Sequence, residues 1–330
     1  MADTARESVV IAGAGPIGLA CALSARRRGL DPLLLDHGAI VNSIVRYPVG
    51  MSFFTTPELL EIGGHPFPCA GEKPTREEAM RYYRGIVRTE RLRVRTDTRL
   101  LGAERRGSTL HLSMDGYGGP RELEADRLVL ATGYLDHPRR LGVPGEDLEH
   151  VRHLYDEGHL SHGQDVVVVG GKNSAVEAAL DLFRCGARVT LVHRNEAIGE
   201  TVKYWMKPDF ENRLRAGELA ARFRTQVTRI EPDRVHVVGP DGAAAELPAR
   251  RVYLLTGYQP DFDLFRRCGV NLDPDTLRPE LNPENLESNV PGIHLVGSIT
   301  RGRQVSDVFI ENGRFDGEKV FANLPLRSAP

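Results

Sequence analysis

Residues 9–18 read VVIAGAGPIG, and this stretch decides the fold that we expect. Its four leading apolar residues favour a strand buried on both faces of a parallel sheet. Gly13 permits a tight turn, Gly15 lets the backbone approach a pyrophosphate, and Gly18 lets a helix pack closely on the strand. Pro16 suits the first helical turn, where its missing N–H is not needed. The stretch predicts a strand, a phosphate-binding loop and a helix.

An acidic residue at the end of the next strand indicates a ribose contact. The apolar run 32–35 leads into Asp36, which lies 21 residues after Gly15. A carboxylate at that spacing receives the ribose hydroxyls of a bound dinucleotide. A glycine turn without a ligand is the alternative, but strand, loop, helix and acid together favour a nucleotide site.

A second signature of the same kind begins about half a chain later. Residues 166–175 read VVVVGGKNSA, again an apolar run followed by glycines. Lys172 occupies the middle position, where the motif usually has glycine. We expect its ammonium group to neutralise a pyrophosphate, and a loop that stands away from the phosphate is the alternative.

The two halves can be compared in register. Asp36 follows Gly13 by 23 residues, and His193 follows Gly170 by the same number, with Arg194 beside it. An acid at this position would repel a 2′-phosphate, whereas a His-Arg pair attracts one. The second site is therefore predicted to prefer NADPH to NADH.

Two dinucleotide sites in one chain indicate an enzyme that passes electrons from one nucleotide to the other. An N-terminal site followed by a second one is the flavoprotein arrangement, with FAD in the first site and NADPH in the second. We expect FAD at Gly13, Gly15, Pro16, Ile17, Gly18, Asp36 and Asn42. Later segments resemble those of flavoprotein reductases with two dinucleotide sites, and this resemblance implies further FAD contacts at Thr132, Gly133, Gly297, Gln304 and Val305. We expect NADPH at Gly170, Gly171, Lys172, Asn173, Ser174, Ala175, His193, Arg194, Lys203 and Gly257, with a solvated surface lysine as the alternative for Lys203.

Length and composition fit this organisation. The chain has 330 residues, enough for two domains, and we expect an FAD-binding domain from residues 1–136 and 259–330 with an NADPH-binding domain, 137–258, inserted. Residues 92–123 are predicted to form strands in a hairpin-like insert. The 43 basic and 45 acidic residues nearly balance, so the charge points to neither a nucleic-acid nor an anionic-membrane partner, and none is expected. The four cysteines have no metal-ligand spacing, and no apolar run is long enough for a membrane span, so a soluble, cytoplasmic, reduced protein is expected.

Further segments resemble the low-molecular-weight thioredoxin reductases, and the bacillithiol disulfide reductase family more closely. They are GKNSAV at 171–176, LATGY at 130–134, VPGEDL at 143–148 and FIENGRF at 309–315. The resemblance spans nearly the whole chain. It implies an α/β fold with two Rossmann-like domains of the thioredoxin reductase type, and an FAD- and NADPH-dependent homodimer that reduces the disulfide of bacillithiol. The family shares Lys172, which supports the second site.

The sequence departs from these relatives in its cysteines. Thioredoxin reductases carry a redox-active dithiol just before the second loop, but residues 151–162 contain no cysteine, which excludes a dithiol relay. The bacillithiol family often has cysteine in the first loop, where this chain has Ile17. Cys69, in a Pro-rich loop, is the candidate catalytic thiol, with an ordinary loop residue as the alternative.

The resemblance also implies a role for the end of the chain. A helix is predicted from about residue 306 to 323, with Ser306 or Asp307 as its N-cap and its positive end toward the flavin.

The electron acceptor is expected to be a small-molecule disulfide or a small redox protein. Two rival functions stay open: a ferredoxin–NADP⁺ reductase of the thioredoxin-reductase-like type, and a non-catalytic redox sensor that binds FAD and NADPH.

Overall fold

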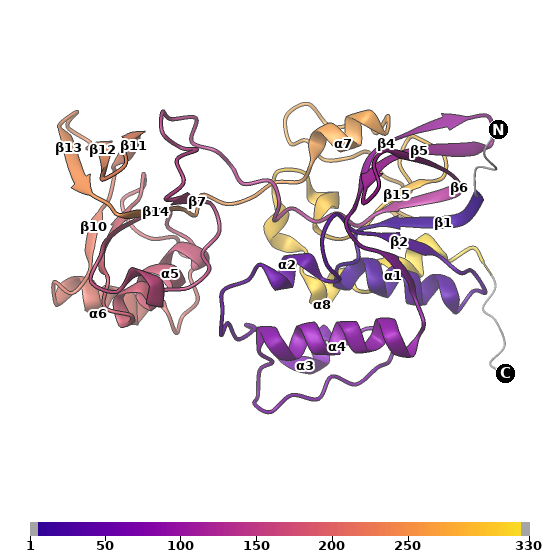
Figure 1. The fold of residues 1–330 in the computed structure, drawn as a ribbon, viewed down its shortest axis with the longest axis horizontal. Helices are drawn as coiled ribbons and strands as arrows, with labels where there is room; N and C mark the ends of the chain where they lie inside the picture. Colours follow the sequence, from indigo (N-terminus) through magenta and orange to yellow (C-terminus); the bar gives the residue numbers. More distant parts are fainter. Residues whose placement is uncertain (1–5, 325–330) are drawn as a thin grey trace. The chain divides into compact units, whose positions relative to one another are not determined.

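The computed structural model describes residues 6–324, which form two compact units. Unit 1 contains the chain up to Arg46, Gly50–His137 and the chain from Tyr258 onward. Unit 2 contains Tyr47–Val49 and Pro138–Gly257. Each unit has a sheet with a parallel core and helices packed beside it (Figure 1). The predicted α/β fold class is therefore confirmed.

The sheet of unit 1 contains the strand that the first motif predicts. In β1 (Arg6–Ala12), Val10 pairs in parallel register with Leu33 on one side and Leu128 on the other, and all three side chains are buried. A strand buried in this way has no polar face, which is why its sequence is a continuous apolar run. The other strands are β2 (Leu33–Leu35), β3 (Arg93–Arg95), β4 (Thr98–Arg106), β5 (Thr109–Gly116), β6 (Arg121–Leu130) and β15 (Ile293–Leu295). In the described residues their order is β3-β2-β1-β6-β5-β4, and β15 also pairs with β6.

The strands predicted for residues 92–123 are confirmed. β4 pairs antiparallel with β5, and β5 pairs antiparallel with the first half of β6. The second half of β6 pairs in parallel with β1 and β15. The strand β6 therefore belongs to both the hairpin and the parallel core.

Helices cover the sheet and begin at recognisable signals. α1 (Pro16–Arg26) starts with proline after the first glycine loop and lies between the sheet and α4 (Arg76–Thr89) (Figure 1). Thr75 caps α4, since its side chain accepts from the backbone N–H of Glu78 while the Glu78 carboxylate accepts from the N–H of Thr75. The remaining helices of unit 1 are α2 (Asn42–Val45), α3 (Pro57–Leu60), α7 (Phe262–Arg267), α8 (Ile310–Gly313) and α9 (Asp316–Val320), with 3₁₀ turns η2 (Gly297–Arg301) and η3 (Val305–Asp307).

The prediction of one helix from residue 306 to 323 is wrong. The backbone of Val308 is extended, with φ −118° and ψ 117°, so the turn η3 ends there and α8 begins only at Ile310. The amide of Asn312 replaces the missing helical contacts: its oxygen accepts from the N–H of Phe309 at 2.9 Å, and its nitrogen donates to the carbonyl of Asp307 at 2.9 Å. Asparagine competes with helix formation in this way. Ser306 and Asp307 are therefore not N-caps of a long helix.

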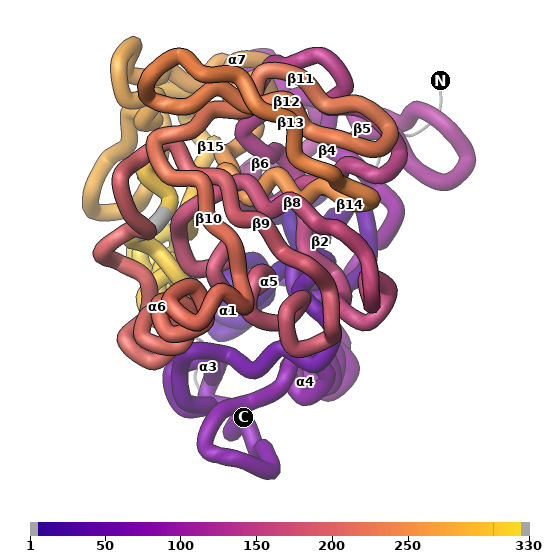
Figure 2. The backbone as a smooth tube through the Cα atoms, turned by 90° about the vertical axis from the view of Figure 1, so that its left-hand side faces the viewer, coloured from indigo at the N-terminus to yellow at the C-terminus, as the bar shows by residue number. Residues whose placement is uncertain are grey.

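Unit 2 repeats the strand–loop–helix order of unit 1. Its strands are β7 (Val151–Arg152), β8 (Asp165–Val169), β9 (Arg188–Val192), β10 (Ala220–Arg222) and β14 (Arg251–Leu254), and its helices are α5 (Asn173–Arg184) and α6 (Lys207–Arg215), with a 3₁₀ turn η1 (His159–Ser161). The strand order β10-β9-β8-β14-β7 is parallel throughout, and Figure 2 shows β10, β9 and β8 side by side. The buried valines of β8 form the centre of this sheet.

An additional antiparallel sheet in unit 2 was not predicted. It consists of β11 (Gln226–Ile230), β12 (Arg234–Val238) and β13 (Ala244–Pro248). Val235 and Val237 alternate with polar neighbours along β12 and are buried with Val167 and Val252 of the parallel sheet. This alternation is the pattern of a strand with one buried face.

Two glycines of unit 1 give a matched test of packing. A Cβ at Gly317 in α9 would lie 2.7 Å from the backbone Cα of Cys21, whereas a Cβ at Gly85 in α4 would meet nothing within 4 Å. We predict that Gly317→Ala lowers the free energy of unfolding by about 1–3 kcal/mol, because α1 and α9 must separate. Gly85→Ala is expected to raise it by up to about 1 kcal/mol through helix propensity. Urea unfolding followed by circular dichroism checks both, and equal effects would contradict the packing of α9 on α1.

Candidate functional site

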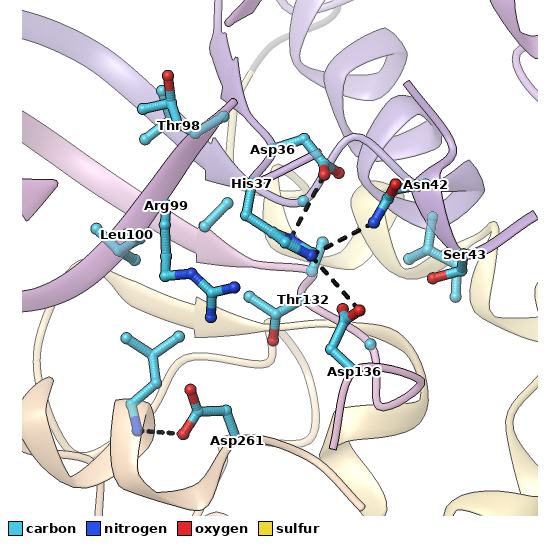
Figure 3. Close-up of a pocket in the computed structure, with 18 of the residues that line it drawn as sticks. Asp36, His37, Asn42, Ser43, Thr98, Arg99, Leu100, Thr132, Asp136 and Asp261 are labelled. Atoms are coloured by element: carbon cyan, nitrogen blue, oxygen red, sulfur yellow. Dashed lines mark hydrogen bonds and ion pairs between the residues drawn. The ribbon is translucent and has the colours of Figure 1, made fainter. Parts of the chain in front are cut away.

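A cavity in unit 1 lies at the carboxyl ends of β1, β2 and β6 (Figure 3). In parallel α/β sheets, ligands bind at this edge. The structure brings many of the predicted FAD residues to its wall: Gly13, Gly15, Pro16, Ile17, Asp36, Asn42, Thr132 and Gly133. Residues that were not predicted also line it, among them His37, Ser43, Thr98, Arg99, Asp136 and Asp261.

The three glycines of the first loop differ in what surrounds them. Gly13 has φ 114°, and a Cβ there would lie 2.3 Å from the carbonyl oxygen of Ala131. A Cβ at Gly18 would lie 1.9 Å from the carbonyl oxygen of Gly13. At Gly15, by contrast, a Cβ would meet nothing within 4 Å, so the loop leaves open space at that glycine. Gly13 and Gly18 therefore serve packing, and Gly15 faces the room that a pyrophosphate needs.

Asp36 occupies the end of β2 as an almost fully buried carboxylate. One of its oxygens accepts from the N–H of Ala14 and the other from the N–H of Gly38, both at 2.9 Å. Burial raises the pKa of Asp36, although these two hydrogen bonds oppose the shift. Each oxygen keeps a second lone pair, so the carboxylate still has acceptor capacity for hydroxyl groups.

The residues that line the cavity include a buried polar atom without a partner among the described residues. The hydroxyl oxygen of Thr132 is buried and makes no hydrogen bond to the described residues, and Gly133 beside it has φ 66°. A buried polar atom without a partner normally marks a place for water or a ligand. The open face of Gly15, the Asp36 carboxylate and the Thr132 hydroxyl together fit a dinucleotide.

Ile17, at the start of α1, connects the loop to the end of the chain. Its Cδ1 atom lies so near Gly297 and Gly313 that a Cβ on either glycine would come within 2.7 Å or 2.6 Å of it. Gly297 is fixed in turn, because its N–H donates to the Asp316 carboxylate at 2.7 Å. Gly297 and Ile17 are thus brought together. Four predicted FAD residues are not among those that line the cavity: Gly18, Gly297, Gln304 and Val305.

The second glycine loop has a similar frame in unit 2. Gly170 has φ 152°, and a Cβ there would lie 2.6 Å from the carbonyl oxygen of Leu255 and 2.8 Å from the Cβ of Ala175. Lys172 is the exposed N-cap of α5 and makes no side-chain cap there, so the first N–H groups of the helix stay available. Ser174 is exposed in the same turn. This frame also fits a phosphate-binding loop.

The predicted basic pair lies directly at this loop. A Cβ on Gly171 would come within 2.4 Å of the imidazole of His193, so the ring covers the loop. The pKa of His193 is lowered below its ordinary value of 6.5, mainly by burial and to a smaller extent by the positive charge of Arg194. The lowered pKa favours the neutral form of His193, and the exposed Arg194 carries the positive charge.

The segment after β9 returns to the loop. The N–H of Gly199 donates to the carbonyl of Gly171 at 2.7 Å, and the N–H of Lys203 donates to the side-chain oxygen of Asn173 at 2.9 Å. These bonds place Lys203 beside the loop, with its ammonium 5.8 Å from the ring centre of Trp205. Gly257 ends the segment after β14, where its carbonyl accepts from the N–H of Arg139 at 2.8 Å.

The structure does not bring any of the four cysteines to the first cavity. Cys21 and Cys268 are buried, and burial raises both pKa values, that of Cys268 to about 11. Burial and nearby Asp181 raise the pKa of Cys185. Cys69 is half-buried, donates to the carbonyl of Gly71 and lines a different cavity, against α4.

The described residues contain neither a membrane-spanning helix nor a cluster of metal ligands. No helix among residues 6–324 is both long and apolar enough to cross a membrane. Within the same residues, no group of three or more His, Cys, Asp or Glu side chains is arranged to hold a metal ion.

Comparisons with known proteins agree with this geometry. A family model described as pyridine nucleotide-disulphide oxidoreductase matches residues 10–297. Bacilliredoxin reductase Bdr of Bacillus subtilis is 37% identical over 325 residues, covering 98% of each chain. The solved structure of bacillithiol disulfide reductase Bdr from Bacillus cereus matches with a TM-score of 0.94 and 38% identity, over 97% of this chain and 98% of that one. Thioredoxin reductase of T. acidophilum has the same fold, with a TM-score of 0.76 and 18% identity over 97% of both chains.

These matches confirm the predicted resemblance and the thioredoxin reductase type of fold. Enzymes of this family pass electrons between a pyridine nucleotide and a flavin, and the two glycine loops supply one phosphate-binding frame in each unit. The chain belongs to the pyridine nucleotide-disulphide oxidoreductase family, and it is an oxidoreductase that uses a flavin and a pyridine nucleotide.

Proposed function

We propose that this protein is an NADPH-dependent disulfide reductase with FAD in the cavity of unit 1 and NADPH at the loop of unit 2. The observation that carries the proposal is the difference between the two glycine loops. The first has a carboxylate, Asp36, at the end of its second strand, whereas the second has His193 and Arg194 there. A carboxylate suits the free ribose hydroxyls of FAD, and a cation suits the 2′-phosphate of NADPH.

The residues of unit 1 bind and orient the flavin nucleotide. We assign the pyrophosphate to the open face of Gly15 and the N–H groups that begin α1, and the adenosine ribose to Asp36. The hydroxyl of Thr132, which also lines the cavity, would supply a further hydrogen bond. When bound, FAD would supply the two-electron redox chemistry that links NADPH to an acceptor.

The acceptor that we propose is a disulfide of bacillithiol, either free or carried by a small redox protein. The names of the two Bdr relatives indicate these two forms. The balanced reaction consumes one NADPH, one proton and one disulfide, and it yields NADP⁺ and two thiols. The first loop has Ile17 in place of a thiol, and the cysteines lie away from the cavity, so we propose that no protein thiol takes part in the reduction of the disulfide.

The acceptor can be identified by anaerobic stopped-flow absorbance. We expect NADPH to bleach the flavin band near 450 nm, and bacillithiol disulfide or a bacillithiol-loaded redox protein to restore it. Ferredoxin as the only acceptor that restores the band would favour the ferredoxin–NADP⁺ reductase alternative. Reduction by NADPH without reoxidation by any acceptor would favour a sensor. Gel filtration of the same sample checks the proposed homodimer.

Coenzyme preference tests the second site. We predict that Arg194→Gln raises the KM for NADPH about tenfold, because one charge-assisted hydrogen bond to the 2′-phosphate is lost. The KM for NADH is expected to stay unchanged, since NADH has no 2′-phosphate. Arg215→Gln on α6, which removes another exposed arginine of unit 2, is the control. An equal loss with both coenzymes would contradict the assignment of Arg194.

A cysteine substitution tests the route of the electrons. We predict that Cys69→Ser reduces the disulfide within about twofold of the wild-type rate, because Cys69 lies outside the first cavity. Cys185→Ser is the matched control in unit 2. If Cys69→Ser keeps flavin reduction by NADPH but loses reoxidation by the disulfide, Cys69 is the catalytic thiol after all.

A further inference from the structure

His37 stands between two carboxylates in the cavity of unit 1 (Figure 3). It follows Asp36 at the end of β2, and its Nδ1 lies 3.6 Å from an Asp36 oxygen. Its Nε2 lies 3.4 Å from an oxygen of Asp136, which follows β6, and 3.3 Å from the amide nitrogen of Asn42 in α2. The ring thus joins two carboxylates from the ends of β2 and β6, which are far apart in the sequence; the Asn42 amide nitrogen is itself a donor and makes no hydrogen bond to a protonated ring.

The charges around the ring favour an imidazolium. The hydrogen bond to Asp136 raises the pKa of His37; burial opposes the shift, and the charges of Asp136 and Asp36 add to it. The Arg99 guanidinium, from β4, acts in the opposite direction. The same contact stabilises the ionised form of Asp136. Burial alone would raise the pKa of Asp136, but the hydrogen bond from His37 and the charges of His37 and Arg46 outweigh burial, and the pKa is lowered.

The two carboxylates differ in their other supports. Asp136 also forms an ion pair with Arg46 of α2 and lies near His137. Asp36 accepts hydrogen bonds from backbone N–H groups, and burial raises its pKa. Since Asp36 has no arginine partner among the described residues like the one that pairs with Asp136, the positive charge of His37 is the main nearby charge that stabilises its ionised form. Only an ionised carboxylate accepts hydrogen bonds on both oxygens without donating one.

We propose that His37 is a positioning residue for the adenosine end of the flavin nucleotide: its imidazolium bridges Asp36 and Asp136 and holds the Asp36 carboxylate in place for the ribose hydroxyls. The inference rests on the proposed function, which assigns FAD to this cavity. Because only the imidazolium carries a proton on both ring nitrogens, the bridge between the carboxylates opens and FAD affinity falls as the pH rises through the raised pKa of His37. At acid pH the affinity falls again, as Asp36 takes up a proton.

The test measures the binding of FAD and FMN to the flavin-free protein by fluorescence titration, from about pH 6 to pH 9. FMN has no adenosine, so it is the internal control. The wild type is expected to lose FAD affinity about tenfold across this range, the size of one lost charge contact. His37→Gln should bind FAD about tenfold more weakly at the lower pH and show no further decline.

A side chain with a permanent positive charge shows whether the charge of His37 or the shape of its ring supports FAD binding. His37→Lys is expected to keep FAD affinity up to the highest pH, where the wild type has lost it, and all three proteins should bind FMN alike. FAD affinity in His37→Gln equal to that of the wild type, or a wild-type profile that is flat with pH, would overturn the role of His37 and leave the proposed function standing. A wild type that binds no FAD at all would overturn both.

Discussion

The contact between the first glycine of each loop and the strand end beside it is the constraint on which both sites depend. In unit 1 a Cβ on Gly13 would lie 2.3 Å from the carbonyl oxygen of Ala131, and in unit 2 a Cβ on Gly170 would lie 2.6 Å from that of Leu255. In each unit the glycine N–H also donates to the end of the second strand, at 2.7 Å to Leu35 and 3.0 Å to Val192. A side chain on either glycine would force apart the three strand ends that meet at its loop.

The same frame supports opposite chemistry in the two units, because the residues around it differ. In unit 1 the glycine Gly15 leaves the loop open, and the end of the second strand carries the buried carboxylate of Asp36. In unit 2 the His193 ring covers Gly171, and Lys172 begins the helix. On the proposed function, backbone geometry would define where a phosphate binds, and the side chains at the strand ends would define which nucleotide fits.

Local patterns predicted the strands, loops and helices of both motifs, because apolar runs and glycines act within a few residues. They were misleading near the end of the chain, where the apparent helix is divided at Val308 and the Asn312 side chain replaces helical hydrogen bonds. The antiparallel sheet β11–β13 was missed, since its short alternating strands become stable only against the buried valines of the parallel sheet. His37 was missed for a related reason: a histidine after an acid has no local signature.

The sequence by itself determined the α/β class, the two nucleotide loops, the absence of a dithiol before the second loop and the resemblance to the disulfide reductases. Each of these depends on residues close together in the chain. The tertiary structure alone decided which polar groups face the first cavity, because β2, α2 and the segment after β6 meet only when the parallel strands pair. It also decided that His37 lies between Asp36 and Asp136, about 100 residues apart, since burial and charge are set by neighbours in space rather than in sequence.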